Sequence, residues 1–315
     1  MTARPRFWFG VFLFALCALL PPIAAVVDQP FYVDIFARMM VWAIAAVSLN
    51  LILGYGAMVS FGHAVYIGIA AYTVGIFAYY DVTSGWIQWP SAVALCAVVA
   101  LLFGIISLRT RGVYFIMITM ALAQMVYFLA VSAEQFGSDD GLVIYDRSTF
   151  GIAWFDLDQP LTRYYTILAA LVGCVYLSYR LVGSRFGRVI RGSRSNEQRM
   201  EAMGYPVVRY RLVCFVIAGA MCGVAGILSA NVEKFVSPDV MYWTKSGELI
   251  FMVALGGMGS LLGPIAGAMV FWLLAEFLAG LTEHWHLIFG PFMVLTVLFA
   301  RRGIDGLFDW RARKS

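Results

Sequence analysis

The chain has 315 residues, of which 62% are hydrophobic and only 13% are charged. Soluble domains usually carry about a quarter charged residues, so this chain could not cover its own surface with polar groups in water. Composition therefore excludes a soluble globular protein and predicts that lipid solvates much of the surface. The net charge of +4 is small, so the distribution of the charges is more informative than their sum.

Apolar runs recur along the whole chain. A transmembrane helix needs roughly 20 apolar residues. The runs predict an all-α polytopic membrane protein with about ten transmembrane helices (8–10), built as a single membrane-spanning domain over residues 1–315. The first run follows Arg4 and Arg6, so a cleaved signal peptide is an alternative interpretation there. The ten runs are 7–27, 37–53, 63–80, 91–108, 113–133, 163–182, 210–230, 246–258, 264–281 and 286–301.

Lysine and arginine are distributed unevenly between the two sets of connecting segments. If the N-terminus is cytoplasmic and every run crosses, 17 of the 22 Lys and Arg residues fall on the cytoplasmic side. Cytoplasmic loops carry an excess of these residues, so the pattern predicts cytoplasmic N- and C-termini. It also predicts that the acidic segment 134–162 is an external loop and that the basic segment 183–209 is cytoplasmic.

A glycine-rich break follows the second run, between Gly54 and Gly62. A loosely similar pattern at 256–263 is compatible with an internal repeat or with chance. Unwound backbone at membrane depth is tolerated only where it is buried in protein or faces water, so the break could line a substrate path. A tight cytoplasmic turn is the alternative. Polar side chains within spans mark pathways or interhelical hydrogen bonds, and the pathway candidates are Asn50, Ser60, His63, Thr119 and Gln124.

The basic segment 183–209 contains the signals of a short helix. Ser195 or Asn196 can cap its start, and Gly204 lies where it should end. Met200 and Met203 are three residues apart and are predicted to share one face. Such a helix could fit a groove on a partner protein. The alternative is a basic loop lying on anionic lipid headgroups.

Motifs for catalysis or metal binding are missing from the sequence. A P-loop needs GxxxxGK[ST], and none of the three lysines lies in that context. The three histidines and five cysteines have neither catalytic nor zinc spacing, and we expect no cofactor or metal in this chain. We interpret the cysteines as small buried apolar residues and the GxxxG pairs as helix-packing positions. These residues are Cys17, Cys96, Cys174, Cys214 and Cys222, with Gly219, Gly223, Gly263 and Gly267.

Four motifs between about residues 40 and 305 together resemble a known family. They are Leu49-Asn-Leu-Ile-Leu-Gly54 with Ser60-Phe-Gly-His63 and Ala71-Tyr-Thr73; Arg111-Gly-Val-Tyr-Phe115 with Thr119 and Ala123-Gln124; Asn196-Glu to Glu201-Ala-Met-Gly204 with Arg209-Tyr-Arg-Leu212; and Gly256-Gly-Met-Gly-Ser260 with Gly263-Pro264 and Gly267-Ala268. The family is that of the LivM-type permeases of branched-chain amino acid ABC importers. The sequence departs from the family pattern at Ala57-Met58 and within Gly137-Ser-Asp-Asp-Gly-Leu142.

The resemblance implies a fold like that of ribose and vitamin B12 importer permeases, in the bacterial cytoplasmic (inner) membrane. It implies four partners besides lipid: a second homologous permease, two ATPase subunits that bind ATP and Mg, and an extracytoplasmic substrate-binding protein. It implies no nucleic acid and no enzymatic activity in this chain. The departures leave urea, short amides or aromatic acids open as substrates beside a branched-chain amino acid. The implied ATPase-coupling residues are Arg194, Glu197, Arg199, Glu201, Ala202 and Gly204.

Two other classes of protein are alternatives. A secondary transporter would need an ionisable group at mid-membrane to couple an ion gradient; only Glu276 and His63 are candidates, and neither is well placed. A membrane-embedded enzyme would need a convergent cluster of His, Asp and Glu, and the sequence offers none.

Overall fold

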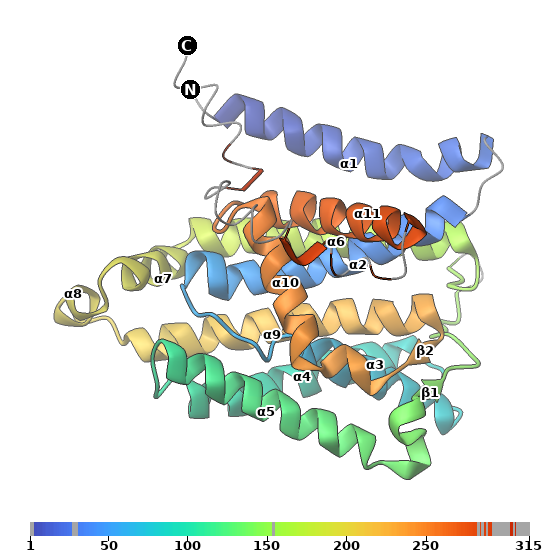
Figure 1. Cartoon of the computed structure of the whole chain (residues 1–315), viewed down its shortest axis with the longest axis horizontal. Helices are drawn as coiled ribbons and strands as arrows, with labels where there is room; N and C mark the ends of the chain where they lie inside the picture. The colour runs from blue at the N-terminus through green and yellow to red at the C-terminus, as the bar shows by residue number, and fades with distance from the viewer. Residues whose placement is uncertain are drawn as a thin grey trace.

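The computed structural model describes residues 3–26, 31–152 and 155–281, with isolated positions between 284 and 306. Most of this part of the chain is helical (Figure 1). The helices are α1 (Ala3–Val26), α2 (Phe31–Asn50), α3 (Val65–Tyr79), α4 (Gly85–Ser107), α5 (Val113–Val131), α6 (Pro160–Gly183), α7 (Arg185–Ser195), α8 (Glu197–Ala202), α9 (Val207–Glu233), α10 (Trp243–Gly256) and α11 (Gly263–Leu281).

The predicted class of a mostly helical membrane protein is confirmed. Six helices in the described residues have the length and composition of membrane spans. Nine of the predicted apolar runs coincide with helices, but α3 and α10, with 15 and 14 residues, are shorter than a full span. The tenth run, 286–301, lies almost entirely outside the described residues. One small β element, β1 (Leu142–Val143) paired antiparallel with β2 (Phe235–Val236), was not predicted.

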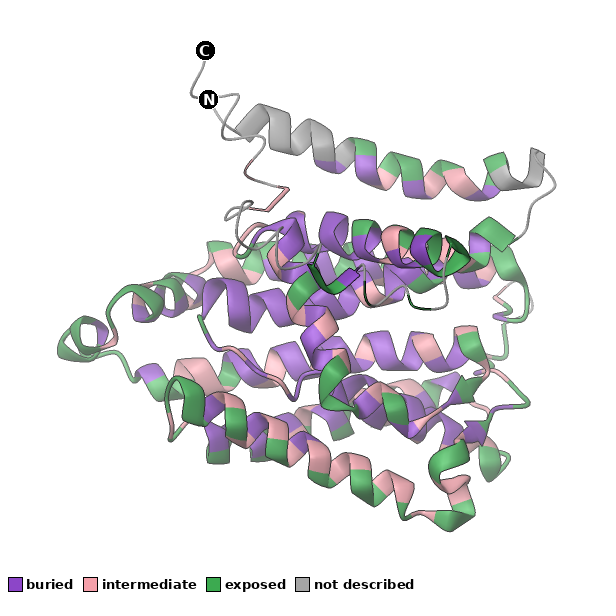
Figure 2. Cartoon of the chain, viewed as in Figure 1, coloured by how far each residue is buried: buried purple, intermediate pink, exposed green. Residues whose placement is uncertain are grey.

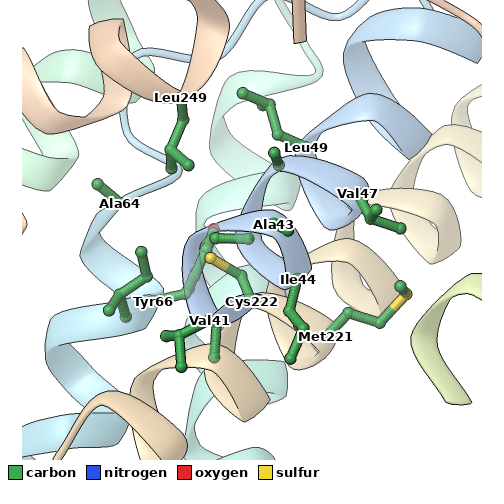
Figure 3. Close-up of a cluster of buried hydrophobic side chains, with 14 of the residues drawn as sticks. Val41, Ala43, Ile44, Val47, Leu49, Ala64, Tyr66, Met221, Cys222 and Leu249 are labelled. Atoms are coloured by element: carbon green, nitrogen blue, oxygen red, sulfur yellow. The ribbon is translucent and has the colours of Figure 1, made fainter. Parts of the chain in front are cut away.

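Helices α2 and α9 lie at the centre of the bundle. α9 packs against α2, α3 and α4, and α2 also packs against α6 and α11. Figure 2 shows that buried residues gather on these central helices, whereas α5 is largely exposed. From Met39 to Asn50, α2 is buried on nearly every side, as expected for a span surrounded by other helices. Figure 3 shows part of this core, where Leu49 of α2, Tyr66 of α3, Cys222 of α9 and Leu249 of α10 gather.

Glycines allow α9 to approach α3 and α4 closely. A Cβ built on Gly226 would lie 2.2 Å from the carbonyl oxygen of Ile67, and one on Gly223 would lie 2.8 Å from Cys96 Sγ. The second GxxxG pair behaves alike, since a Cβ on Gly267 would lie 2.0 Å from the Met252 carbonyl oxygen. The prediction that these glycines serve helix packing is therefore confirmed.

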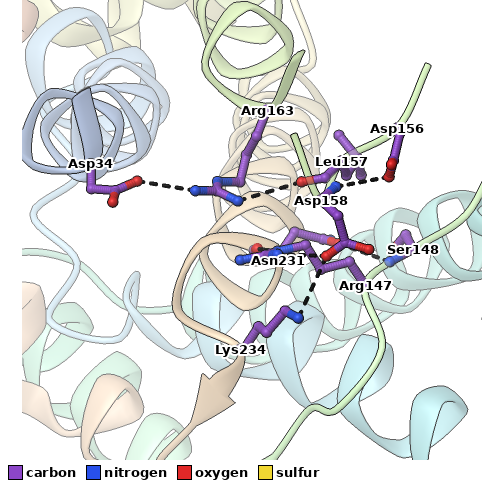
Figure 4. A network of polar contacts seen from close by, with 9 residues as sticks. All are labelled: Asp34, Arg147, Ser148, Asp156, Leu157, Asp158, Arg163, Asn231 and Lys234. Atoms are coloured by element: carbon purple, nitrogen blue, oxygen red, sulfur yellow. Dashed lines mark hydrogen bonds and ion pairs between the residues drawn. The ribbon is translucent and has the colours of Figure 1, made fainter. Parts of the chain in front are cut away.

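The two long connecting segments lie at opposite ends of the bundle. α7 and α8 project from one end, at the left of Figure 1, and β1 and β2 lie at the other. An ionic network holds the second end together (Figure 4). Arg163, only 7% exposed, pairs with Asp34 of α2 at 3.0 Å. Arg147 donates to the Asn231 carbonyl at 2.7 Å and to Asp158 at 2.6 Å, which attaches segment 134–162 to α9.

Candidate functional site

The glycine-rich break is a non-helical segment, residues 56–64, between α2 and α3. α2 first continues into a π-helical turn, Leu51–Tyr55. The chain then leaves the helix at Gly56 and Ala57, the latter in a left-handed conformation at φ 54°. Much of the break is buried by other helices. A Cβ on Gly62 would lie 2.3 Å from the Thr119 carbonyl oxygen of α5, so glycine is required for this approach.

Asn50 joins this region to the second glycine-rich turn, residues 257–262 between α10 and α11. Its side chain is 2% exposed. Nδ2 donates to the carbonyl of Ser260 at 2.8 Å, and Oδ1 accepts from the amide of Gly259 at 2.9 Å. Both polar atoms of the amide are therefore used, and the two segments that share a loose sequence pattern are hydrogen-bonded to each other.

His63 lies near the end of the break and is buried in the core. His63 and Ser48 of α2 are fully buried, and His63 Nε2 lies 2.9 Å from Ser48 Oγ. The Ser48 hydroxyl also lies 2.7 Å from the Ala45 carbonyl oxygen. A hydroxyl has one proton, so donation to that carbonyl requires His63 Nε2 to carry the proton in the pair. Within the described chain, the buried Nδ1 atom has no hydrogen-bond partner.

The remaining pathway candidates lie around the same break. Ser60 is fully buried, and its hydroxyl accepts from the Gly62 amide at 3.4 Å. Thr119 of α5 accepts from the Phe61 amide at 3.3 Å. Gln124 is half-buried five residues further along α5. Three of the five candidates, Ser60, His63 and Thr119, therefore meet at the break inside the bundle of this chain, whereas Asn50 binds the second glycine-rich turn.

Sequence reasoning missed two serines that organise this site. Ser48 orients His63, and the fully buried Ser246 of α10 accepts from the Ala64 amide at 3.0 Å. The candidates were singled out as polar residues within spans, a criterion that Ser48 also meets. Ser246 lies at the start of its apolar run, next to Lys245, where a polar residue gives little signal.

The basic segment forms two short helices, of which only α8, with its cap at Asn196, was predicted. Ser184 caps α7, and Asn196 caps α8 by accepting from the Arg199 amide at 2.9 Å. The prediction of a shared methionine face is wrong. Met200 packs into a small cluster with Val189 and Val207, whereas Met203 is exposed because α8 ends at Ala202.

The predicted coupling residues divide into two groups. Arg194 Nη1 donates to the carbonyl of Gly54, so α7 contacts the π-helical turn directly. Glu197, with its side chain 14% exposed, pairs with Arg111 at 3.2 Å and with Arg211 of α9 at 2.9 Å. The side chains of these two residues contact other parts of the bundle, although Arg194 is itself exposed. The other four, Arg199, Glu201, Ala202 and Gly204, are exposed.

Comparison with known proteins decides the family. The family model described as branched-chain amino acid transport system / permease component matches residues 31–298. The chain belongs to this family. No solved structure gives a significant match.

Curated relatives of this permease family are similar over most of the chain. The high-affinity branched-chain amino acid transport system permease protein LivM of Salmonella typhimurium is 27% identical over 86% of this chain and 69% of the relative. LivM of Escherichia coli K12 is 26% identical over the same shares. LivH of Escherichia coli K12, a permease protein of the same named system, is 29% identical over 45% of each chain. The resemblance to LivM-type permeases inferred from four motifs is thus confirmed.

Proposed function

We propose that this chain is the permease subunit of an ATP-binding-cassette importer in the bacterial cytoplasmic membrane. It moves a small polar solute, such as a branched-chain amino acid, inward by alternating access. The family match supports the permease class. One structural observation carries the mechanism: Arg194 of α7 is hydrogen-bonded to Gly54, at the entrance to the break between α2 and α3.

In this proposal the end of the bundle with α7 and α8 is cytoplasmic, and segment 134–162 is external. Both termini are cytoplasmic, with about ten spans in a single domain. The exposed residues Arg199, Glu201, Ala202 and Gly204 contact an ATPase subunit. Separate ATPase subunits bind and hydrolyse ATP with Mg, and this chain holds no cofactor. A substrate-binding protein docks at the external end, and a second homologous permease completes the pathway. Curated LivM and LivH relatives, two permease proteins of one named system, support this last partner.

Hydrogen bonds provide a continuous route from the coupling segment to the membrane core. Movement of α7 pulls on Gly54 through Arg194. Asn50, in the turn before Gly54, transmits that movement to Gly259 and Ser260 and so to α10 and α11. Coupling of distant sites needs such a contiguous element with two arrangements. We propose that the break has these two arrangements, one of which opens the pathway.

The buried pathway candidates fit a gate better than an open binding surface. Ser60, His63 and Thr119 are hydrogen-bonded to the break or to α2 in this conformation. A solute would reach them only when the break moves. The substrate is proposed as a branched-chain amino acid, with urea, short amides and aromatic acids as alternatives. The ion-coupled alternative is not favoured, because Glu276 is exposed and His63 is enclosed in the core beside Ser48.

The test is co-purification followed by reconstitution. The tagged chain should carry a second permease and P-loop ATPases through purification in mild detergent, and the reconstituted assembly should take up solute only with ATP. Arg194→Gln should retain the ATPases but lose most uptake, because the contact with Gly54 is lost. Arg188→Gln is the matched control, since Arg188 is exposed on the same helix. A chain that purifies alone and transports without ATP would refute the proposal.

A further inference from the structure

A cavity of about 170 Å³ lies beside α7 and α8, where four segments distant in sequence meet. Its walls are residues 56–58 of the break, the turn between α4 and α5, the start of α5, and the junction of α7–α8 with α9. The cavity shares Arg194 and Glu197 with the coupling segment and residues 56–58 with the break, but the transport proposed above needs no ligand in it. The inference below concerns binding alone, so it stands or fails separately from the proposed transport.

Positive charge in the cavity exceeds negative charge. Arg111, Arg194 and Arg211 line it together with a single carboxylate, Glu197. That carboxylate is shared, with Oε1 at 3.2 Å from Arg111 and Oε2 at 2.9 Å from Arg211. One glutamate cannot neutralise three guanidinium groups, and the buried Nε of Arg211 has no hydrogen-bond partner within the described chain. Buried donors without partners are costly, so the cavity is electrostatically suited to an anion.

The shape of the donors favours a phosphate group. Guanidinium groups present forked N–H pairs that match phosphate oxygens. The 19-residue helix α5 begins at Val113, beside the cavity, and its first amides add positive potential. At Gly112, with φ 61°, no atom lies within 4 Å of the position that a Cβ would occupy, so there is open space beside this glycine of the lining.

The apolar residues of the cavity wall favour a phosphate that is attached to an apolar chain, as in a phospholipid. Met58, Leu108 and Phe115 complete the wall. Near it in the sequence, Ile105 of α4 and Tyr114 of α5 are exposed apolar side chains. In a membrane these side chains contact lipid tails. Basic pockets between helices at a membrane face are sites where anionic lipid headgroups bind.

We propose that this cavity binds a phosphate group, supplied by the headgroup of an anionic phospholipid. The phosphate lies among Arg111, Arg194 and Arg211 and neutralises the charge that Glu197 leaves unbalanced. A free phosphate ion shares the same chemistry and is the second source that the experiment separates.

The first arm measures lipid binding to the full-length chain after delipidation in mild detergent. Phosphatidylglycerol and phosphatidylcholine are titrated separately, and bound lipid is counted by native mass spectrometry. Arg111→Gln should weaken phosphatidylglycerol binding about tenfold, the loss typical of one charge-assisted hydrogen bond. Arg109→Gln is the matched control, since Arg109 is an exposed arginine of the same turn that does not line the cavity. Arg111 is 67% exposed, so its replacement should leave the fold intact.

The second arm titrates inorganic phosphate and follows the thermal midpoint of the same variants. If phosphate raises the thermal midpoint of wild type and Arg109→Gln but not of Arg111→Gln, and the chain shows no preference for phosphatidylglycerol, the site belongs to the free ion. Equal lipid binding by both variants means only diffuse surface attraction and overturns the proposal. If Arg111→Gln binds lipid and phosphate like the wild type but no longer co-purifies with an ATPase, the arginines bind a carboxylate of that protein. That result overturns the proposal.

Discussion

Replacing Asn50 by alanine should separate the two glycine-rich segments. The substitution removes two hydrogen bonds, at 2.8 and 2.9 Å, from a side chain that is 2% exposed. The Gly259 amide and the Ser260 carbonyl then lose their partners. A buried polar group without a partner costs about 1–3 kcal/mol. Gly259 and Ser260 are only partly buried and the two losses share one site, so we expect a total near the lower end, about 2–4 kcal/mol. At about 2 °C per kcal/mol for a chain of this size, the thermal midpoint should fall by roughly 4–8 °C.

The measurement is thermal unfolding of the purified chain in detergent, followed by tryptophan fluorescence. Ser132→Ala is the control, because Ser132 is exposed and its hydroxyl bonds only to the Phe128 carbonyl of its own helix, at 2.6 Å. That variant should shift the midpoint by about 1 °C at most, as surface substitutions usually do. If Asn50→Ala and Ser132→Ala unfold at the same temperature, the hydrogen bonds of Asn50 do not join the two segments and the route from α7 to α10 is wrong.

Three further outcomes follow from the described contacts. Gly226→Ala should destabilise the protein by about 1–3 kcal/mol, because the added methyl group overpacks against Ile67. Gly173→Ala should stabilise it by up to about 1 kcal/mol, because no atom lies within 4 Å of the added methyl group. Thermal unfolding should therefore show midpoint shifts of opposite sign for the two variants. The hydrogen bond from Arg147, with nearby Lys234, holds the pKa of Asp158 below its usual value. A carboxyl group with a depressed pKa stabilises the fold at pH values above its pKa in the unfolded chain, about 3.9. The difference in thermal midpoint between wild type and Asp158→Asn should therefore shrink as the pH falls below about 4. A difference that stays constant with pH would contradict the pairing. The five cysteines are buried and free, so a bulky hydrophilic maleimide should label all five only after denaturation, as counted by mass spectrometry.

Several features could be predicted because they depend on local pattern alone. Hydrophobicity identified nine helices, since a chain in lipid must satisfy its backbone hydrogen bonds within each segment. The GxxxG spacing predicted close helix packing, and Asn196 predicted the cap of α8. Four motifs were enough to indicate the family that the comparison then showed.

The pairing of polar groups was decided by the tertiary structure. Asn50 bonds to residues about 210 positions away, and Arg194 bonds to Gly54 across 140 positions. The sequence marked Asn50, His63 and Arg194 as polar, but it could not show that they contact one another's segments rather than solute or solvent. Likewise, Met200 packs inward, whereas Met203, one position beyond the end of α8 at Ala202, is exposed. Local periodicity determines which residues form a helix, whereas the partners of a buried polar group depend on which helices pack together, and that is a property of the whole bundle.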